Sequence, residues 1–127
     1  MSVRVDQVMA TAAAAALHTP VSQELRTRYR QLRQMLHSSG LVATYAFIAA
    51  KSNAQDEIAK AYGRVASILR ERLAQLDLLS SKTLEHDRVL CELGELPAER
   101  YARASVEATS LVQWLSRLAD ALYQEKQ

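Results

Sequence analysis

Apolar residues recur at steps of three and four between residues 101 and 122 of this 127-residue chain. The stripe consists of Tyr101, Ala104, Ala108, Leu111, Leu115, Leu118 and Leu122. This spacing keeps one face of an α-helix apolar along its whole length. Pro97 suits the first turn of such a helix, and Glu99 suits its positive end. We therefore expect a long amphipathic helix within a bundle core, since an isolated coiled coil would need more heptads.

The rest of the composition also favours helices. The chain has 21 alanines and 18 leucines but only 3 glycines and 2 prolines. No alternating apolar and polar segment of useful length predicts a strand. The expected fold is all-α, a single bundle of five or six helices that makes one domain of residues 1–127.

Helix-breaking residues divide the chain into expected helices over residues 3–17, 21–37, 41–50 and 54–79. A weakly patterned helix that reaches Leu93 follows, and then the long last helix. Gly40 suits a left-handed helix end. Asn53 is the expected cap of the fourth helix, with Asp56 as its capping-box acid. Gly63 inside that helix suggests a tight helix crossing.

Residues 41–50 form the most unusual segment. Between Leu41 and Ala50 the only polar residue is Thr44, and the segment ends at Lys51. A helix that is apolar on every side is normally buried by its neighbours. We expect a short central helix here, with Lys51 at its exit.

The sequence offers little for catalysis, a cofactor or a metal. The glycines are isolated, so no phosphate-binding loop exists, and the three histidines form no metal-binding motif. Cys91 is expected to be a buried apolar residue, and its lack of a partner fits a reducing cytoplasm. The Ala-rich start is interrupted by Asp6 and Gln7, unlike a signal peptide, and no apolar run reaches membrane-spanning length. The expected protein is cytoplasmic and not an enzyme.

Basic residues gather in the first part of the chain. Residues 1–51 hold six basic and two acidic side chains, whereas residues 52–127 hold ten and twelve. Arg26, Arg30 and Arg33 share one helix face with His37, and no acid lies between Arg26 and Lys51. Such a row suits contact with successive phosphates, and a solvated helix face explains it equally well. The candidate nucleic-acid-binding residues are Arg26, Arg30, Arg33, Lys51, Lys60 and Arg64.

Two motifs resemble a known family. The segment YRQLRQMLHSSGLVATYAFIAAKS, residues 29–52, resembles the central motif of the small α-helical subunit of type III-B CRISPR Cmr effector complexes. The segment ERYARASVEATSLVQWLSRLADAL, residues 99–122, is similar to the last helix of that family.

This resemblance implies a non-catalytic helical bundle with no cofactor. Its copies would stack head-to-tail beside the other complex subunits and line the path of the target RNA near the guide RNA. Two alternatives stay open: a helical protein-interaction adaptor with no nucleic-acid role, and a small enzyme with an unrecognised site. Salt-dependent RNA binding would separate the first alternative from the family's role.

Overall fold

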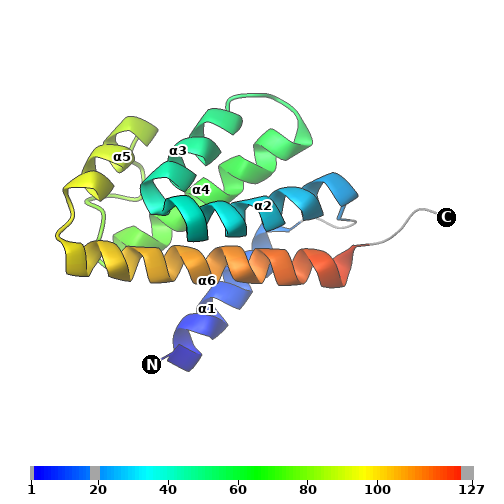
Figure 1. Ribbon diagram of the computed structural model, residues 1–127, viewed down its shortest axis with the longest axis horizontal. Coiled ribbons are helices and arrows are strands. Elements are labelled where there is room, and N and C mark those ends of the chain that lie inside the picture. Colours follow the sequence, from blue (N-terminus) through cyan, green and yellow to red (C-terminus); the bar gives the residue numbers. More distant parts are fainter. Residues whose placement is uncertain (1, 18–20, 124–127) are drawn as a thin grey trace.

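A computed structural model describes residues 2–17 and 21–123, with side chains from residue 7 onward. These residues form an all-α bundle with no β-strand, as predicted. Its six helices are α1 (Ser2–Ala16), α2 (Gln23–Ser39), α3 (Leu41–Lys51), α4 (Glu57–Gln75), α5 (His86–Glu95) and α6 (Ala98–Leu122). In Figure 1, α2 runs alongside α6, and α1 crosses α6.

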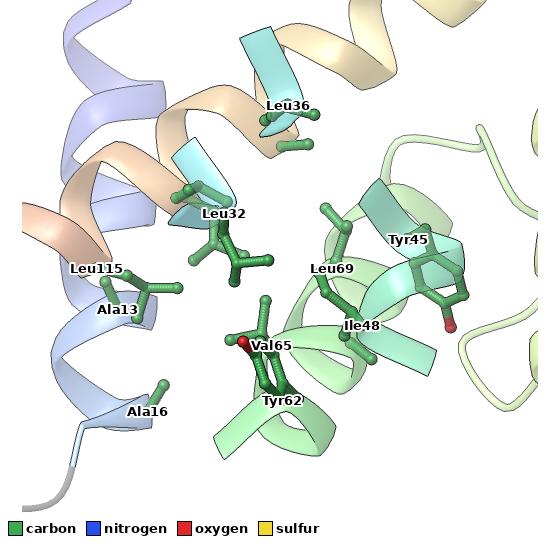
Figure 2. Close-up of a cluster of buried hydrophobic side chains, with 14 of the residues drawn as sticks. Ala13, Ala16, Leu32, Leu36, Tyr45, Ile48, Tyr62, Val65, Leu69 and Leu115 are labelled. Atoms are coloured by element: carbon green, nitrogen blue, oxygen red, sulfur yellow. The ribbon is translucent and has the colours of Figure 1, made fainter. Parts of the chain in front are cut away.

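The core lies between α6 and the helices that cover it. The predicted stripe of α6 is buried at Ala104, Ala108, Leu111 and Leu115 and half-buried at Leu118, whereas Leu122 is 39% exposed. The small side chains of Ala13 and Ala16 let α1 come close to the bundle, and Figure 2 shows Ala13 beside Leu115. The apolar stripe of α2, which includes Leu32 and Leu36, enters the same cluster.

Gly40 separates α2 from α3 as the sequence predicts. Its φ of 89° lies in the region that favours glycine. Its N–H donates to the Leu36 carbonyl oxygen at 3.1 Å and so closes α2. The N–H of Val42, in the first turn of α3, donates to the hydroxyl oxygen of Tyr101 at 3.1 Å. This bond ties the start of the central helix to α6.

The start of α4 differs from the prediction. Asn53 is not its cap, because residues 52–56 form a turn and the helix begins at Glu57. Asp56 is the N-cap, and its carboxylate accepts the Ala59 N–H at 2.8 Å. An aspartate at this position satisfies a helix N–H that has no partner within the helix.

The end of α4 also differs, because the helix stops at Gln75 rather than reaching residue 79. Asp77 adopts a positive φ of 60°. The Asp77 N–H then donates to the Ala74 oxygen at 3.0 Å, and the Leu78 N–H donates to the Leu73 oxygen at 2.8 Å. This pair of bonds is a Schellman motif, here with aspartate instead of glycine in the left-handed position. The apolar run continues through Leu78 and Leu79, which are buried beyond the helix end.

The tight crossing predicted at Gly63 is wrong. A Cβ built at this glycine would meet the Ser52 Cβ as its nearest neighbour at 4.0 Å, an ordinary contact.

The prediction for Cys91 is also wrong, because this side chain is exposed on α5. Helix α5 is short and buries only Val89 and Leu93, so most of its surface faces water. It also runs past Leu93, the expected last residue, and ends at Glu95.

The central helix α3 is apolar in composition but has two different sides. Leu41, Thr44, Tyr45, Ile48 and Ala49 are buried, whereas Ala43, Ala46 and Ala50 are exposed. The exposed positions hold alanine, whose small side chain costs little when it faces water. The bundle therefore covers one face of α3 and leaves an uncharged alanine face open.

Candidate nucleic-acid interface

The predicted arginine row lies on the side of α2 that faces α6. Leu25, Tyr29, Leu32 and Leu36 form the buried stripe of α2, and Arg26, Arg30 and Arg33 follow beside it at helical spacing. The stripe fixes the rotation of the helix, because turning it would expose the leucines. The rotation brings the arginines to the groove between α2 and α6.

One carboxylate on α6 holds two of these arginines. The Asp120 Oδ1 accepts from Arg26 Nε at 2.7 Å and from Arg30 Nη2 at 3.0 Å. The hydrogen bond from Arg26, helped by the charge of Arg30, lowers the pKa of Asp120 below its usual value. The Arg26 guanidinium also lies over the Tyr123 ring, 4.7 Å from its centroid. This end of the groove therefore carries two cations and one anion.

The other end of the groove is basic without an acid. A pocket of about 490 Å³ lies there between α2 and α6. Its walls are Arg33, Gln34, Leu36, His37 and Ser38 of α2, with Thr109 and Gln113 of α6. The lining combines a guanidinium with amide, imidazole and hydroxyl groups and contains no carboxylate. Such a set of donors suits an anion with several oxygens.

Lys51 and Lys60 lie on other helices, near the α3–α4 connection. Lys51 ends α3, is exposed, and its ammonium lies 5.6 Å from the centroid of the Phe47 ring. Phe47 in turn meets the Tyr62 ring edge-on, with centroids 5.8 Å apart. The Lys51 head is thus held over a ring that is itself packed against α4. Lys60 is exposed on the first turns of α4.

Arg64 has a different environment from the other candidates. Its Nε donates to the Ala16 carbonyl oxygen at 2.9 Å, and the residue is half-buried. Ala16 ends α1, whose last turn has no basic residue of its own. Arg64 therefore donates to a carbonyl oxygen at the negative end of α1. It also borders a largely apolar groove of about 430 Å³ between α1 and α4.

Arg28 is a further basic residue of α2 that lies off the arginine row. It lies two residues from both Arg26 and Arg30, so it faces the opposite side of α2 from these Asp120-bound arginines. Burial raises the pKa of Tyr62, and Arg28 partly offsets that rise. Arg28 also pairs with Glu24 across one helical turn at 3.6 Å. Apart from Arg64, the candidate binding residues are thus divided between the α2–α6 groove and the α3–α4 side.

A polar network joins α3, α4 and α5 away from these groups. Arg70 Nη1 donates to the Tyr45 hydroxyl oxygen at 3.2 Å, and that hydroxyl bonds to His86 Nδ1 at 2.8 Å. Because Arg70 can only donate, the Tyr45 O–H is free to donate to the imidazole. The three groups hold α5 to the bundle.

Two further findings concern the described part of the chain. No three His, Cys, Asp or Glu side chains there come close enough to hold a metal ion. No helix there has the length and apolar character needed to cross a membrane.

The fold and the site therefore define this protein as an all-α bundle with a basic groove between α2 and α6. The family model of a CRISPR-associated protein, Cas_Cmr5, matches residues 3–122. The chain belongs to this family, the small-subunit family of the type III-B Cmr system, as the two motifs predicted. Neither a curated protein nor a solved structure matches the chain.

Proposed function

We propose that this chain is the non-catalytic small subunit of a cytoplasmic type III-B Cmr effector complex. In that role it works with the other complex subunits in RNA-guided antiviral defence. It lines the path of the target RNA beside the guide RNA and contacts the RNA backbone. Membership of the Cas_Cmr5 family supports this role. The surface that we assign to the RNA is the α2–α6 groove.

The observation that carries the RNA assignment is the row of Arg26, Arg30 and Arg33 along that groove, followed by the acid-free pocket around Arg33 and His37. Arginine forks bind phosphate oxygens in pairs, so a row of them suits a sugar-phosphate strand. Tyr29 and Tyr45 are buried, and no Phe, Tyr or Trp side chain lines the pocket. The proposed contact therefore involves the backbone and not stacked bases, and it is independent of base sequence.

Lys51 and Lys60 add a second, smaller contribution from the α3–α4 side, since both are exposed. Arg64 contributes least among the six candidates, because its Nε–H is already bonded to Ala16 and part of its side chain is buried. Its replacement is expected to affect the docking of α1 more than RNA binding.

The test is the triple variant Arg26→Ala/Arg30→Ala/Arg33→Ala within the assembled complex. Each exposed ion pair lost with Asp120 costs only about 0.2–1 kcal/mol, so the bundle stays folded. Target RNA is expected to dissociate faster from the variant complex, to a similar extent for unrelated sequences. The slope of the logarithm of the binding constant against the logarithm of the salt concentration should become shallower by about 0.7 for each lost phosphate contact.

The matched control is Lys82→Ala/Arg88→Ala/Arg103→Ala. These three side chains are exposed, lie outside the groove, and remove the same formal charge. If both triple variants retain RNA with unchanged affinity and salt slope, the arginine row is only a solvated face. The adaptor role without nucleic acid is then the better explanation.

We further propose that copies of the subunit associate weakly, head-to-tail, along the RNA. The support is the family together with the uneven charge of the two sequence halves, and heterologous contacts of this kind do not close into a dimer. Sedimentation velocity should show a species whose size grows gradually with concentration. A single tight dimer at all concentrations would contradict the stacking.

A further inference from the structure

We propose that the carboxylate of Asp120 is an internal competitor of RNA phosphate: it occupies Arg26 and Arg30 in the free subunit, and an RNA strand enters the α2–α6 groove by displacing it. The inference rests on the proposed RNA contact and adds the residue that limits its affinity. Three features of the groove support it.

The first feature is how the two arginines are used. Both guanidiniums converge on one oxygen, Asp120 Oδ1, through Arg26 Nε and Arg30 Nη2. A guanidinium has five N–H donors in a planar fork. The fork of Arg30 therefore keeps donors for an anion with two free oxygens, such as a phosphodiester. The carboxylate takes the position of one phosphate oxygen and leaves the paired geometry unfilled.

The second feature is accessibility. The Asp120 side chain is 42% exposed and that of Arg30 is 47% exposed, so both are open to a polymer in solution. Exposed ion pairs of this kind contribute little to stability. The carboxylate is therefore held strongly enough to compete with a phosphate and weakly enough to be displaced.

The third feature is the place of Asp120 in its own helix. It lies in the last turn of α6, which ends at Leu122 and has no basic residue in that turn. A carboxylate at the negative end of a helix is unfavourable. The stability of α6 therefore does not explain an aspartate here. Its favourable contacts are the two arginines of α2.

The groove continues from this ion pair into the acid-free pocket. Arg26 and Arg30 lie about 6 Å apart along the axis of α2, and Arg33 follows one turn further at the pocket wall. A strand that displaces Asp120 can thus pass directly to Arg33 and His37. Asp120 is the carboxylate bonded at the start of this path, and the pocket at its other end has no carboxylate in its lining.

The experiment measures binding of a fluorescein-labelled oligouridylate to the full chain at low salt by fluorescence anisotropy. Asp120→Asn keeps the shape of the side chain and removes its charge. We expect this variant to bind about two- to thirtyfold more tightly than wild type, the range that corresponds to the loss of two exposed ion pairs. Circular dichroism confirms that the variant keeps its helices.

The matched control is Glu24→Gln, which changes net charge equally. Glu24 is also paired with an arginine of α2, namely Arg28, but on the side away from the groove. We expect it to change RNA affinity by less than about twofold, because general charge alone acts weakly and is screened by salt. The gain from Asp120→Asn should also disappear in an Arg26→Ala/Arg30→Ala background, where no guanidinium is left to release.

Three results would overturn the proposal: Asp120→Asn binding no better than Glu24→Gln, a gain that persists without Arg26 and Arg30, or no RNA binding by wild type and Asp120→Asn alike. The proposed function has its own test in the assembled complex. If the triple arginine variant loses RNA there while Asp120→Asn gains nothing, the RNA contact stands and only the competitor role of Asp120 fails.

Discussion

The ion pair between Arg72 of α4 and Glu107 of α6 offers a strong test of how this bundle is held together. Arg72 Nε and Glu107 Oε1 are 2.5 Å apart, and the Glu107 side chain is only 5% exposed. Glu107 is the one charged residue among the buried positions of the described chain. The change to make is Glu107→Gln, which keeps the volume and removes the charge.

The expected loss follows from what remains after the change. Removing one partner of a buried ion pair costs about 3–5 kcal/mol, because the other charge stays buried and unpaired. The Arg72 side chain is 19% exposed, so water partly compensates, and the glutamine oxygen still accepts a hydrogen bond. We therefore expect the free energy of unfolding to fall by about 2–3 kcal/mol. This is a large share of the roughly 5–15 kcal/mol that stabilises a typical domain.

Replacing both partners should have a different effect. The double variant Arg72→Met/Glu107→Leu leaves no charge behind and fills similar space with apolar groups. Such replacements are often neutral or stabilising, so we expect its unfolding free energy to lie within about 1 kcal/mol of wild type or above it.

The assay is urea unfolding followed by the helical circular dichroism signal. The control is Glu24→Gln, which breaks the exposed Arg28–Glu24 pair and should cost no more than about 0.5 kcal/mol. A loss below about 1 kcal/mol for Glu107→Gln, together with a double variant less stable than the single one, would refute the argument from an unpaired buried charge.

Two further predictions use the same unfolding assay. Gly40→Ala should cost about 1–3 kcal/mol because Gly40 has a φ of 89°. Gly63→Ala should raise the free energy of unfolding by about 0.5–1 kcal/mol, since this helical glycine has room for a Cβ. Equal effects of the two alanine substitutions would refute the argument from backbone conformation. Burial raises the pKa of Tyr29 to about 12, with Arg64 opposing the rise. A raised folded pKa gives stability that is complete below the unfolded pKa and lost as pH rises from about 10 to 12. Tyr29→Phe should therefore flatten the fall in unfolding free energy across that range, and an unchanged slope would contradict it. Because the Tyr29 hydroxyl has no partner among the described residues, this variant should cost little at neutral pH.

Much of the fold follows from local patterns along the chain. The stripe of α6 predicts its buried face, because residues three and four apart share one side of a helix wherever the helix packs. Gly40 predicts the end of α2 for an equally local reason, its tolerance of positive φ. The arginine row could be placed on one face of α2 in the same way.

Local patterns were weaker where two competing signals lay close together. Asn53 and Asp56 are both good caps, and the choice of Asp56 depends on the turn that joins α3 to α4. The apolar residues beyond Gln75 continue the helical pattern, yet Asp77 ends α4 by adopting a positive φ. Aspartate does so less often than glycine, and the sequence carried no clear signal for it.

The sequence by itself determined the helices, the buried stripes and the basic face of α2, because each depends on residues within a few positions of one another. Only the tertiary structure decided what those faces meet. Asp120 reaches Arg26 across 94 residues of chain, Glu107 reaches Arg72 across 35, and Arg64 reaches Ala16 across 48. Each is a charged group satisfied by a partner on another helix, and helix periodicity carries no information about which helix will lie alongside. The arginine row was therefore visible in the sequence, whereas the carboxylate that neutralises part of it became visible only when α6 packed against α2.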